Sequence, residues 1–251
     1  MIGNETDLGM DTFVLRGEAA KYVLFQRTQY IKYANDRLVM GIDRRVPLPV
    51  FNTAVRIEGA LNQSLIADQY FAEMKTEFAS IRPHLPETCA AWMDIGCGIG
   101  GIDVLIWEHY AKGRASDDCP DVYLLDKTAT AGKVWYGFKN TGAFYNSLPA
   151  AKAFLADNGV DAGKIHTLEA SDDNAIAMDR SLDLVLSLIS WGFHYPVETY
   201  LDRVHALLRP HGRLLIDVRT DTDGFARITD KFSSATSVLD TDKYRRVLAV
   251  K

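Results

Sequence analysis

The chain of 251 residues has the composition of an ordinary folded protein, with 47% hydrophobic and 24% charged residues. A net charge of −5 provides no basic field to attract nucleic acid. No apolar run approaches the roughly 18 residues of a membrane span, and residues 1–7 are too polar for a signal peptide. We therefore expect a cytoplasmic protein with neither a nucleic-acid partner nor membrane insertion.

The cysteines indicate a reducing compartment. There are three of them, an odd number, and none forms a CxxC pair. The sequence therefore predicts no zinc site and no metal cofactor. Cys97 is expected to be a small packing residue rather than a nucleophile.

Residues 1–87 are predicted to form a helical leader that covers a substrate. One helix face is indicated by apolar residues spaced four, four, four and three apart: Ile66, Tyr70, Met74, Phe78 and Ile81. Pro83 and Pro86 should end that helix. An earlier helix is expected over 17–37 and an extended connector over 46–50. Tyr30 and Tyr33 on the earlier helix either pack against other helices or line a substrate lid.

From residue 88 to 251, strands and helices alternate, which predicts a Rossmann-like α/β domain. Apolar runs rich in Leu, Val and Ile predict five strands covered on both faces. They span residues 90–95, 121–126, 164–169, 182–189 and 213–218. Two further segments, 234–239 and 244–250, are expected to form a closing hairpin.

The most informative segment runs Ala-Trp-Met-Asp-Ile-Gly-Cys-Gly-Ile-Gly-Gly over residues 91–101. An apolar strand enters a turn whose glycines tolerate positive φ and allow a ligand to approach the backbone closely. The spacing Gly96-x-Gly98-x-x-Gly101 formally satisfies the dinucleotide fingerprint. A pyrophosphate would, however, be repelled by Asp94, whereas a cationic methyl donor would be attracted.

Residues 88–251 resemble the class I S-adenosylmethionine-dependent methyltransferases. The resemblance rests on Asp-Ile-Gly-Cys-Gly-Ile-Gly at 94–100, Asp126, Asp-Leu-Val at 183–185, and Leu-Leu-Arg-Pro-His-Gly-Arg at 207–213. It implies S-adenosyl-L-methionine as the cofactor. It also implies a seven-stranded methyltransferase sheet, mostly parallel with an antiparallel C-terminal hairpin, behind an N-terminal helical lid.

The same resemblance assigns cofactor contacts at the carboxyl ends of the strands. The acid before the first glycine lies near the methionine end, and Asp126 accepts the ribose hydroxyls. Asp172 is favoured over Asp173 and Asn174 for the adenine amino group, with a simple turn as the alternative. The full predicted set is Asp94, Gly96, Cys97, Gly98, Gly100, Asp126, Lys127, Ser171, Asp172 and Ser190.

The transferable methyl group should point toward residues 187–196, Ser-Leu-Ile-Ser-Trp-Gly-Phe-His-Tyr-Pro, which are predicted to form a loop. Exposed aromatic side chains are costly there unless they contact a ligand or lid. His194 is the candidate general base, since histidine removes protons near neutral pH. Tyr195 completes the predicted catalytic pair. A histidine held in a structural loop is the alternative.

A long connection follows the second strand and carries five aromatic residues between 132 and 146. It either covers the substrate or packs on the leader. The next helix should begin after Ser147 and end at 158–159. The predicted substrate contacts are Tyr30, Tyr33, Trp135, Tyr136, Tyr145, Trp191 and Phe193.

Segments 144–148 and 190–196 resemble bacterial sugar O-methyltransferases. This narrower resemblance implies O-methylation of a hydroxyl on a small-molecule or saccharide acceptor. N-methylation of a small amine, an inactive cofactor-binding scaffold and an NAD-dependent oxidoreductase remain alternatives, and a homodimer is left open. Asp217 could join a magnesium site, although no motif requires it, and the incomplete calcium loop at Asp221 and Asp223 fails.

Overall fold

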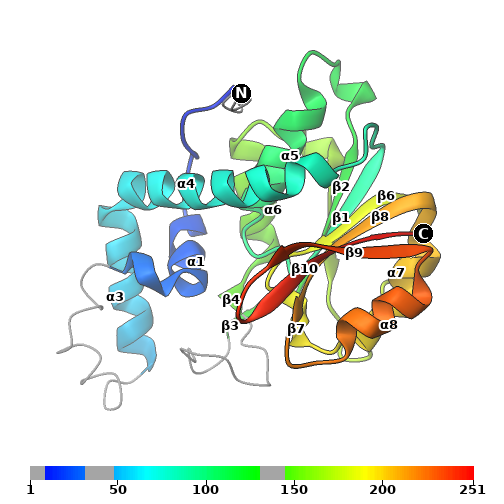
Figure 1. Ribbon diagram of the computed structural model, residues 1–251. Coiled ribbons are helices and arrows are strands. Elements are labelled where there is room, and N and C mark those ends of the chain that lie inside the picture. The colour runs from blue at the N-terminus through cyan, green and yellow to red at the C-terminus, as the bar shows by residue number, and fades with distance from the viewer. Residues whose placement is uncertain (1–8, 32–47, 131–144) are drawn as a thin grey trace, which may run out of the picture.

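The computed structural model describes residues 9–31, 48–130 and 145–251, and it is built around a seven-stranded sheet (Figure 1). The strands, in spatial order, are β5 (Ile165–Glu169), β2 (Asp121–Asp126), β1 (Ala91–Ile95), β6 (Leu182–Ser187), β8 (Leu208–Arg219), β10 (Tyr244–Val250) and β9 (Ser234–Asp240). The first five are parallel, and β10 is antiparallel to both β8 and β9. This order confirms the predicted seven-stranded methyltransferase sheet with its C-terminal hairpin.

Helices cover both faces of the sheet, because the central strands bury side chains on both sides. On one face lie α5 (Gly101–Ala111), α6 (Leu148–Asp157) and the N-terminal helices. On the other lie α7 (Leu201–Leu207) and α8 (Gly224–Lys231). Strand β1 shows the alternation: Trp92 packs into the first cluster, whereas Met93 and Ile95 pack into the second.

The N-terminal segment forms α1 (Ala19–Gln26), a 3-10 turn (Thr28–Tyr30), α3 (Leu48–Leu61), α4 (Gln63–Ile81) and a second 3-10 turn (Arg82–His84). All five residues of the predicted apolar face on α4 are buried, which confirms that helix. The expected extended connector is wrong from Leu48 onward, because α3 already begins there. Pro49 fits the first helical turn, where its missing N–H costs nothing.

A buried arginine ties α4 to the sheet. Arg246 on β10 is fully buried and binds Asp217 on β8 through Nε at 2.7 Å and Nη2 at 2.8 Å. It also contacts Glu77 and Ser80 of α4 at 2.8 and 2.6 Å. A buried charge needs such compensation. Asp217 is therefore the partner of an arginine, and this pairing disfavours the magnesium role considered above.

The segment predicted as a loop over 187–196 is a strand for most of its length. Strand β7 (Ser190–Tyr195) lies beside β8 and is followed by a 3-10 turn (Val197–Thr199). Gly192 has φ +84°, and a Cβ there would lie 2.9 Å from the Asp217 carbonyl oxygen. The prediction failed because an aromatic run with a central glycine does not reveal the packing of β7 on the sheet.

The remaining elements are short. Strand β3 (Ala129–Thr130) pairs with β4 (Tyr145–Asn146), and 3-10 turns cover Ser116–Asp118 and Ala162–Lys164. Helix α6 begins after Ser147, whose Oγ accepts a hydrogen bond from the Ala150 N–H at 3.3 Å, so the predicted cap is confirmed. None of the described helices has the length and hydropathy of a bilayer crossing.

Candidate functional site

The glycine turn after β1 is tightly enclosed. Gly96, Gly98 and Gly100 adopt φ of +77°, +56° and +83°, which other residues adopt only with strain. A Cβ on Gly96 would lie 1.8 Å from Ser190 Oγ, and one on Gly98 would lie 2.7 Å from Gln26 Oε1. The fold thus brings Ser190 of β7 and Gln26 of α1 against the turn.

Asp126, the last residue of β2, closes the other side of the turn. Its Oδ2 accepts hydrogen bonds from the Gly98 N–H at 2.9 Å and the Asn146 amide at 2.8 Å. Its Oδ1 accepts from the Lys127 N–H at 2.7 Å. Burial raises the pKa of Asp126 in spite of these donors. A carboxylate has about four acceptor positions, and the only further donor among the described residues is the weak Cys97 thiol at 3.9 Å, so a ligand hydroxyl can compete for the fourth position.

Two amide side chains were missed by the sequence analysis. Asn146 is buried and donates to the Gly98 carbonyl at 2.6 Å as well as to Asp126. Gln26 Nε2 lies 3.5 Å from Asn146 Oδ1. Asn146 lies in the segment 144–148 that was singled out for its resemblance, but its contact with the turn was not predicted, because both amides reach the turn only through the packing of α1 and the pairing of β4 with β3.

Asp94 lies beneath the turn with its carboxyl buried against a second acid, Asp103 of α5. The two carboxyls lie close enough to act on each other, and burial raises the pKa of both. Asp103 Oδ1 also accepts from Trp92 Nε1 at 2.8 Å. Asp103 was not predicted as a site residue, since an acid in the first turn of a helix ordinarily faces the helix dipole in water.

The predicted adenine-binding residues lie near Asp126 but are exposed. Lys127 Nζ forms an ion pair with Asp172 at 2.7 Å, and the Asp172 side chain is 94% exposed. Ser171 donates instead to Asp173, which also accepts from the Ala175 N–H. The fold brings Lys127 and Asp172 together at the carboxyl edge of the sheet, and whether they bind an adenine stays a prediction.

His194 and Tyr195 have different electrostatic surroundings. Burial, together with the charge of Arg219, lowers the pKa of His194, so its imidazole is neutral at pH 7. Burial raises the pKa of Tyr195 to about 12, with the Asp126 carboxylate adding to the effect. Tyr195 therefore keeps its proton at pH 7 and is influenced by Asp126, whereas His194 is influenced by Arg219 at the end of β8.

The predicted substrate contacts fare unevenly. Trp191 is fully buried and donates from Nε1 to the Val197 carbonyl at 3.0 Å, so its packing role replaces the predicted contact. Phe193 is 4% exposed against Tyr244 and Arg219, which also favours packing. The Tyr30 hydroxyl donates to Glu73. Tyr33, Trp135, Tyr136 and the side chain of Tyr145 lie outside the described residues.

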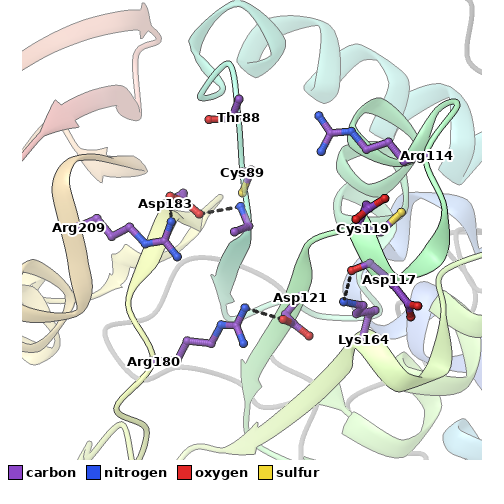
Figure 2. Close-up of a pocket in the computed structure, with 12 residues that line it drawn as sticks. Thr88, Cys89, Arg114, Asp117, Cys119, Asp121, Lys164, Arg180, Asp183 and Arg209 are labelled. Carbon is purple, nitrogen blue, oxygen red and sulfur yellow. Dashed lines mark hydrogen bonds and ion pairs between the residues drawn. The ribbon is translucent and has the colours of Figure 1, made fainter.

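A pocket of about 330 Å³ lies at the opposite, amino ends of the parallel strands (Figure 2). Two of its acids are paired: Asp121 binds Arg180 at 2.7 Å, and Asp183 binds Arg209 at 2.8 Å. Asp183 also accepts from the N–H groups of Ala90 and Ala91. These ion pairs join the starts of neighbouring strands, which is a structural role.

No protein-family model and no curated protein matches the chain. Solved structures share parts of the fold. A 16S rRNA N2 methyltransferase of T. thermophilus, in complex with AdoMet and guanosine, aligns over 71% of this chain and 42% of its own, with 13% identity and a TM-score of 0.48.

Two further structures align over more of their own length. StiE O-MT, residues 961–1257, covers 80% of each chain at 13% identity, with a TM-score of 0.48. A precorrin-6y C5,15-methyltransferase from Geobacter metallireducens covers 71% of this chain and 88% of its own at 14% identity, with a TM-score of 0.45. Similarities this low do not carry an activity over to the present chain.

Proposed function

We propose that this chain is an S-adenosyl-L-methionine-dependent methyltransferase that acts on a hydroxyl of a small molecule, with a saccharide as the favoured acceptor. The observation that carries the proposal is the pairing of the positive-φ glycine turn with Asp94, a buried acid without a cationic partner in the described residues. A site that stores uncompensated negative charge fits a cofactor bearing an ammonium and a sulfonium, and disfavours a pyrophosphate.

The residues present fit such a cofactor. Asp94 would hold the ammonium, and the backbone of Gly96, Gly98 and Gly100 would line the path to the nucleoside. Asp126 would accept one ribose hydroxyl directly and a second once the Asn146 amide turns away, since Asn146 fills one of its acceptor positions. Lys127 and Asp172 lie farther along this edge, where the adenine would be placed.

When bound, S-adenosyl-L-methionine supplies an electrophilic methyl group. The chain's own contribution is mainly positioning, which accounts for a large part of the rate in reactions of this kind. Neutral His194 can accept the proton of the acceptor hydroxyl, and protonated Tyr195 can donate a hydrogen bond. The leader, tied to the sheet by Arg246, covers the turn with Gln26.

Binding of S-adenosylhomocysteine and of NAD, each titrated calorimetrically into the purified protein, tests the cofactor. We expect S-adenosylhomocysteine to bind and NAD not to. Binding of NAD alone would overturn the proposal in favour of the oxidoreductase alternative. Binding of S-adenosylhomocysteine without transfer of a methyl group to any saccharide, small alcohol or amine would support the inactive scaffold.

The base is tested by His194→Ala, with His205→Ala on α7 as the matched control. Removing a general base typically costs about 10²- to 10⁴-fold in kcat. We expect that loss for His194→Ala with S-adenosylhomocysteine affinity unchanged, and wild-type turnover for His205→Ala. An acceptor amine would need no strong base, so full turnover by His194→Ala would favour N-methylation.

A further inference from the structure

Asp103 is a fully buried carboxyl to which the proposed function gives no task. It lies in the first turn of α5, and its Oδ1 accepts from Trp92 Nε1. Its Oδ2 is buried and receives no N–H and no hydroxyl hydrogen from the described residues, which leaves a carboxyl proton as its possible donor. A Cβ on Gly100 would lie 3.4 Å from that oxygen, so the glycine turn directly covers it.

The contact between Asp103 and Asp94 needs a proton. Both carboxyls are withdrawn from water, with 3% exposure for Asp94 and none for Asp103. Two carboxylates cannot hydrogen-bond to each other unless one is protonated, and burial of like charges favours a single shared proton. Since the Trp92 N–H stabilises a negative Asp103, the proton belongs mainly on Asp94.

The surrounding groups do not remove the need for that proton. Asp126 at the end of β2 adds negative charge, and Cys97 in the turn is a buried thiol whose pKa is raised by burial. From α4, the Tyr70 hydroxyl accepts from the Gly101 N–H and is itself protonated, with its pKa raised to about 12 by burial. Arg27, which follows α1 and acts on Tyr70, is paired with Glu73 at 2.5 Å.

We infer that Asp94 and Asp103 form a proton-linked ammonium site, in which an incoming ligand ammonium displaces the proton that the two carboxyls share. The inference rests on the proposed function. The Asp94 O–H bond breaks, the proton passes to the solvent buffer, and an ammonium N–H forms a hydrogen bond to the carboxylate. Asp103 is a positioning residue, because it acts on the ligand only through Asp94.

The pH dependence of binding follows from this exchange. While the pair still holds its proton, ligand affinity rises about tenfold per pH unit. The rise ends when the pair has lost its proton, and above about pH 8 affinity falls as the ligand α-amino group loses its own. Affinity is therefore greatest between these two limits.

The test is calorimetric titration of S-adenosylhomocysteine at about pH 6 in three buffers of different ionisation enthalpy. The dependence of the observed enthalpy on the buffer counts the protons released. We expect about one proton per ligand for the wild type. Asp103→Asn keeps the Trp92 contact and donates an amide N–H to an ionised Asp94. For this variant we expect almost no release and an affinity nearly independent of pH below about 7.5.

A second ligand gives a control that needs no variant. 5′-Methylthioadenosine keeps the nucleoside but lacks the ammonium, so it should bind the wild type without releasing a proton. Equal release for the two ligands, or for the wild type and Asp103→Asn, would overturn the inference alone. Failure of both ligands to bind would overturn the proposed function and the inference with it.

Discussion

Acids at the two ends of the parallel strands differ in whether a cation is paired with them. At the amino ends, Asp121 and Asp183 each bind an arginine (Figure 2). Around the glycine turn at the carboxyl ends, Asp94, Asp103 and Asp126 have no cationic partner among the described residues, and burial raises the pKa of all three. The difference separates acids whose charge pairs with an arginine between strands from acids to which we assign a ligand ammonium and ribose.

The largest expected effect comes from removing the charge of Asp94. Truncating one partner of a buried charge pair costs about 2–5 kcal/mol, so Asp94→Asn should weaken S-adenosylhomocysteine binding by about 100-fold. Near neutral pH the ligand-free variant should be more stable than the wild type, since an asparagine amide donates to Asp103 without the proton uptake that Asp94 needs on folding. Isothermal titration and thermal unfolding measure the two changes.

Asp183→Asn is the matched control at the amino end. It should change ligand affinity by less than about twofold, because it shares no partner with the turn. If Asp94→Asn and Asp183→Asn weakened binding equally, the distinction between the two ends would fail.

Substituting one glycine by alanine at each end of the parallel strands compares the space that the fold leaves beside the backbone. Gly96→Ala places a Cβ 1.8 Å from Ser190 Oγ at φ +77°, whereas Gly113 has a similar φ of +75° with nothing within 4 Å. Gly113→Ala should cost only the backbone strain, about 1–2 kcal/mol, and Gly96→Ala should cost overpacking of about 1–3 kcal/mol in addition. Urea unfolding measures both, and equal losses would show that Ser190 does not crowd the turn.

The pH dependence of folding stability should distinguish the Asp94–Asp103 pair from the rest of the molecule. In the ligand-free fold, the Asp94–Asp103 pair keeps a proton that unfolded Asp loses near pH 4. The native state therefore binds more protons than the unfolded state above that pH, so the pair's stabilisation is complete below about pH 4 and is lost as pH rises through its raised pKa. The expected slope is about −1.4 kcal/mol per pH unit within this window.

Four histidines oppose this slope, because burial lowers their pKa and their contribution grows as pH rises: His84, His109, His194 and His205. The measurement is therefore the difference in melting temperature between wild type and Asp94→Asn from about pH 5 to 7.5. This range begins about one pH unit above the ordinary pKa of an aspartic acid side chain. The histidine effects cancel in this difference. A constant difference across the range would contradict the shared proton.

The smallest expected effect is at the amino end. Arg209 is 42% exposed in its pair with Asp183, and partly exposed ion pairs contribute about 0–1 kcal/mol. Arg209→Ala should lower the free energy of unfolding by no more than that, with ligand affinity unchanged. Urea unfolding and titration of S-adenosylhomocysteine check the two halves, and a larger loss of affinity would link this end to the site.

Much of the fold follows from local pattern. Short runs of Leu, Val and Ile predict β2 to the residue, since buried parallel strands need apolar side chains on both faces. The spacing of Ile66 to Ile81 predicts α4, and Ser147 predicts the start of α6. The glycine turn could be located because only glycine adopts positive φ without strain.

Contacts between distant segments follow no local pattern, and here the tertiary structure decided. It made Trp191 a core residue by placing β7 on the sheet, and it matched Asp217 to Arg246 across 29 residues of sequence. It brought Gln26 and Asn146 onto the turn and buried Asp103 against Asp94. The sequence by itself determined where the strands and the glycine turn lie, because backbone conformation and apolar periodicity are local. The balance of charge in the site depends on burial, which exists only once the chain has folded.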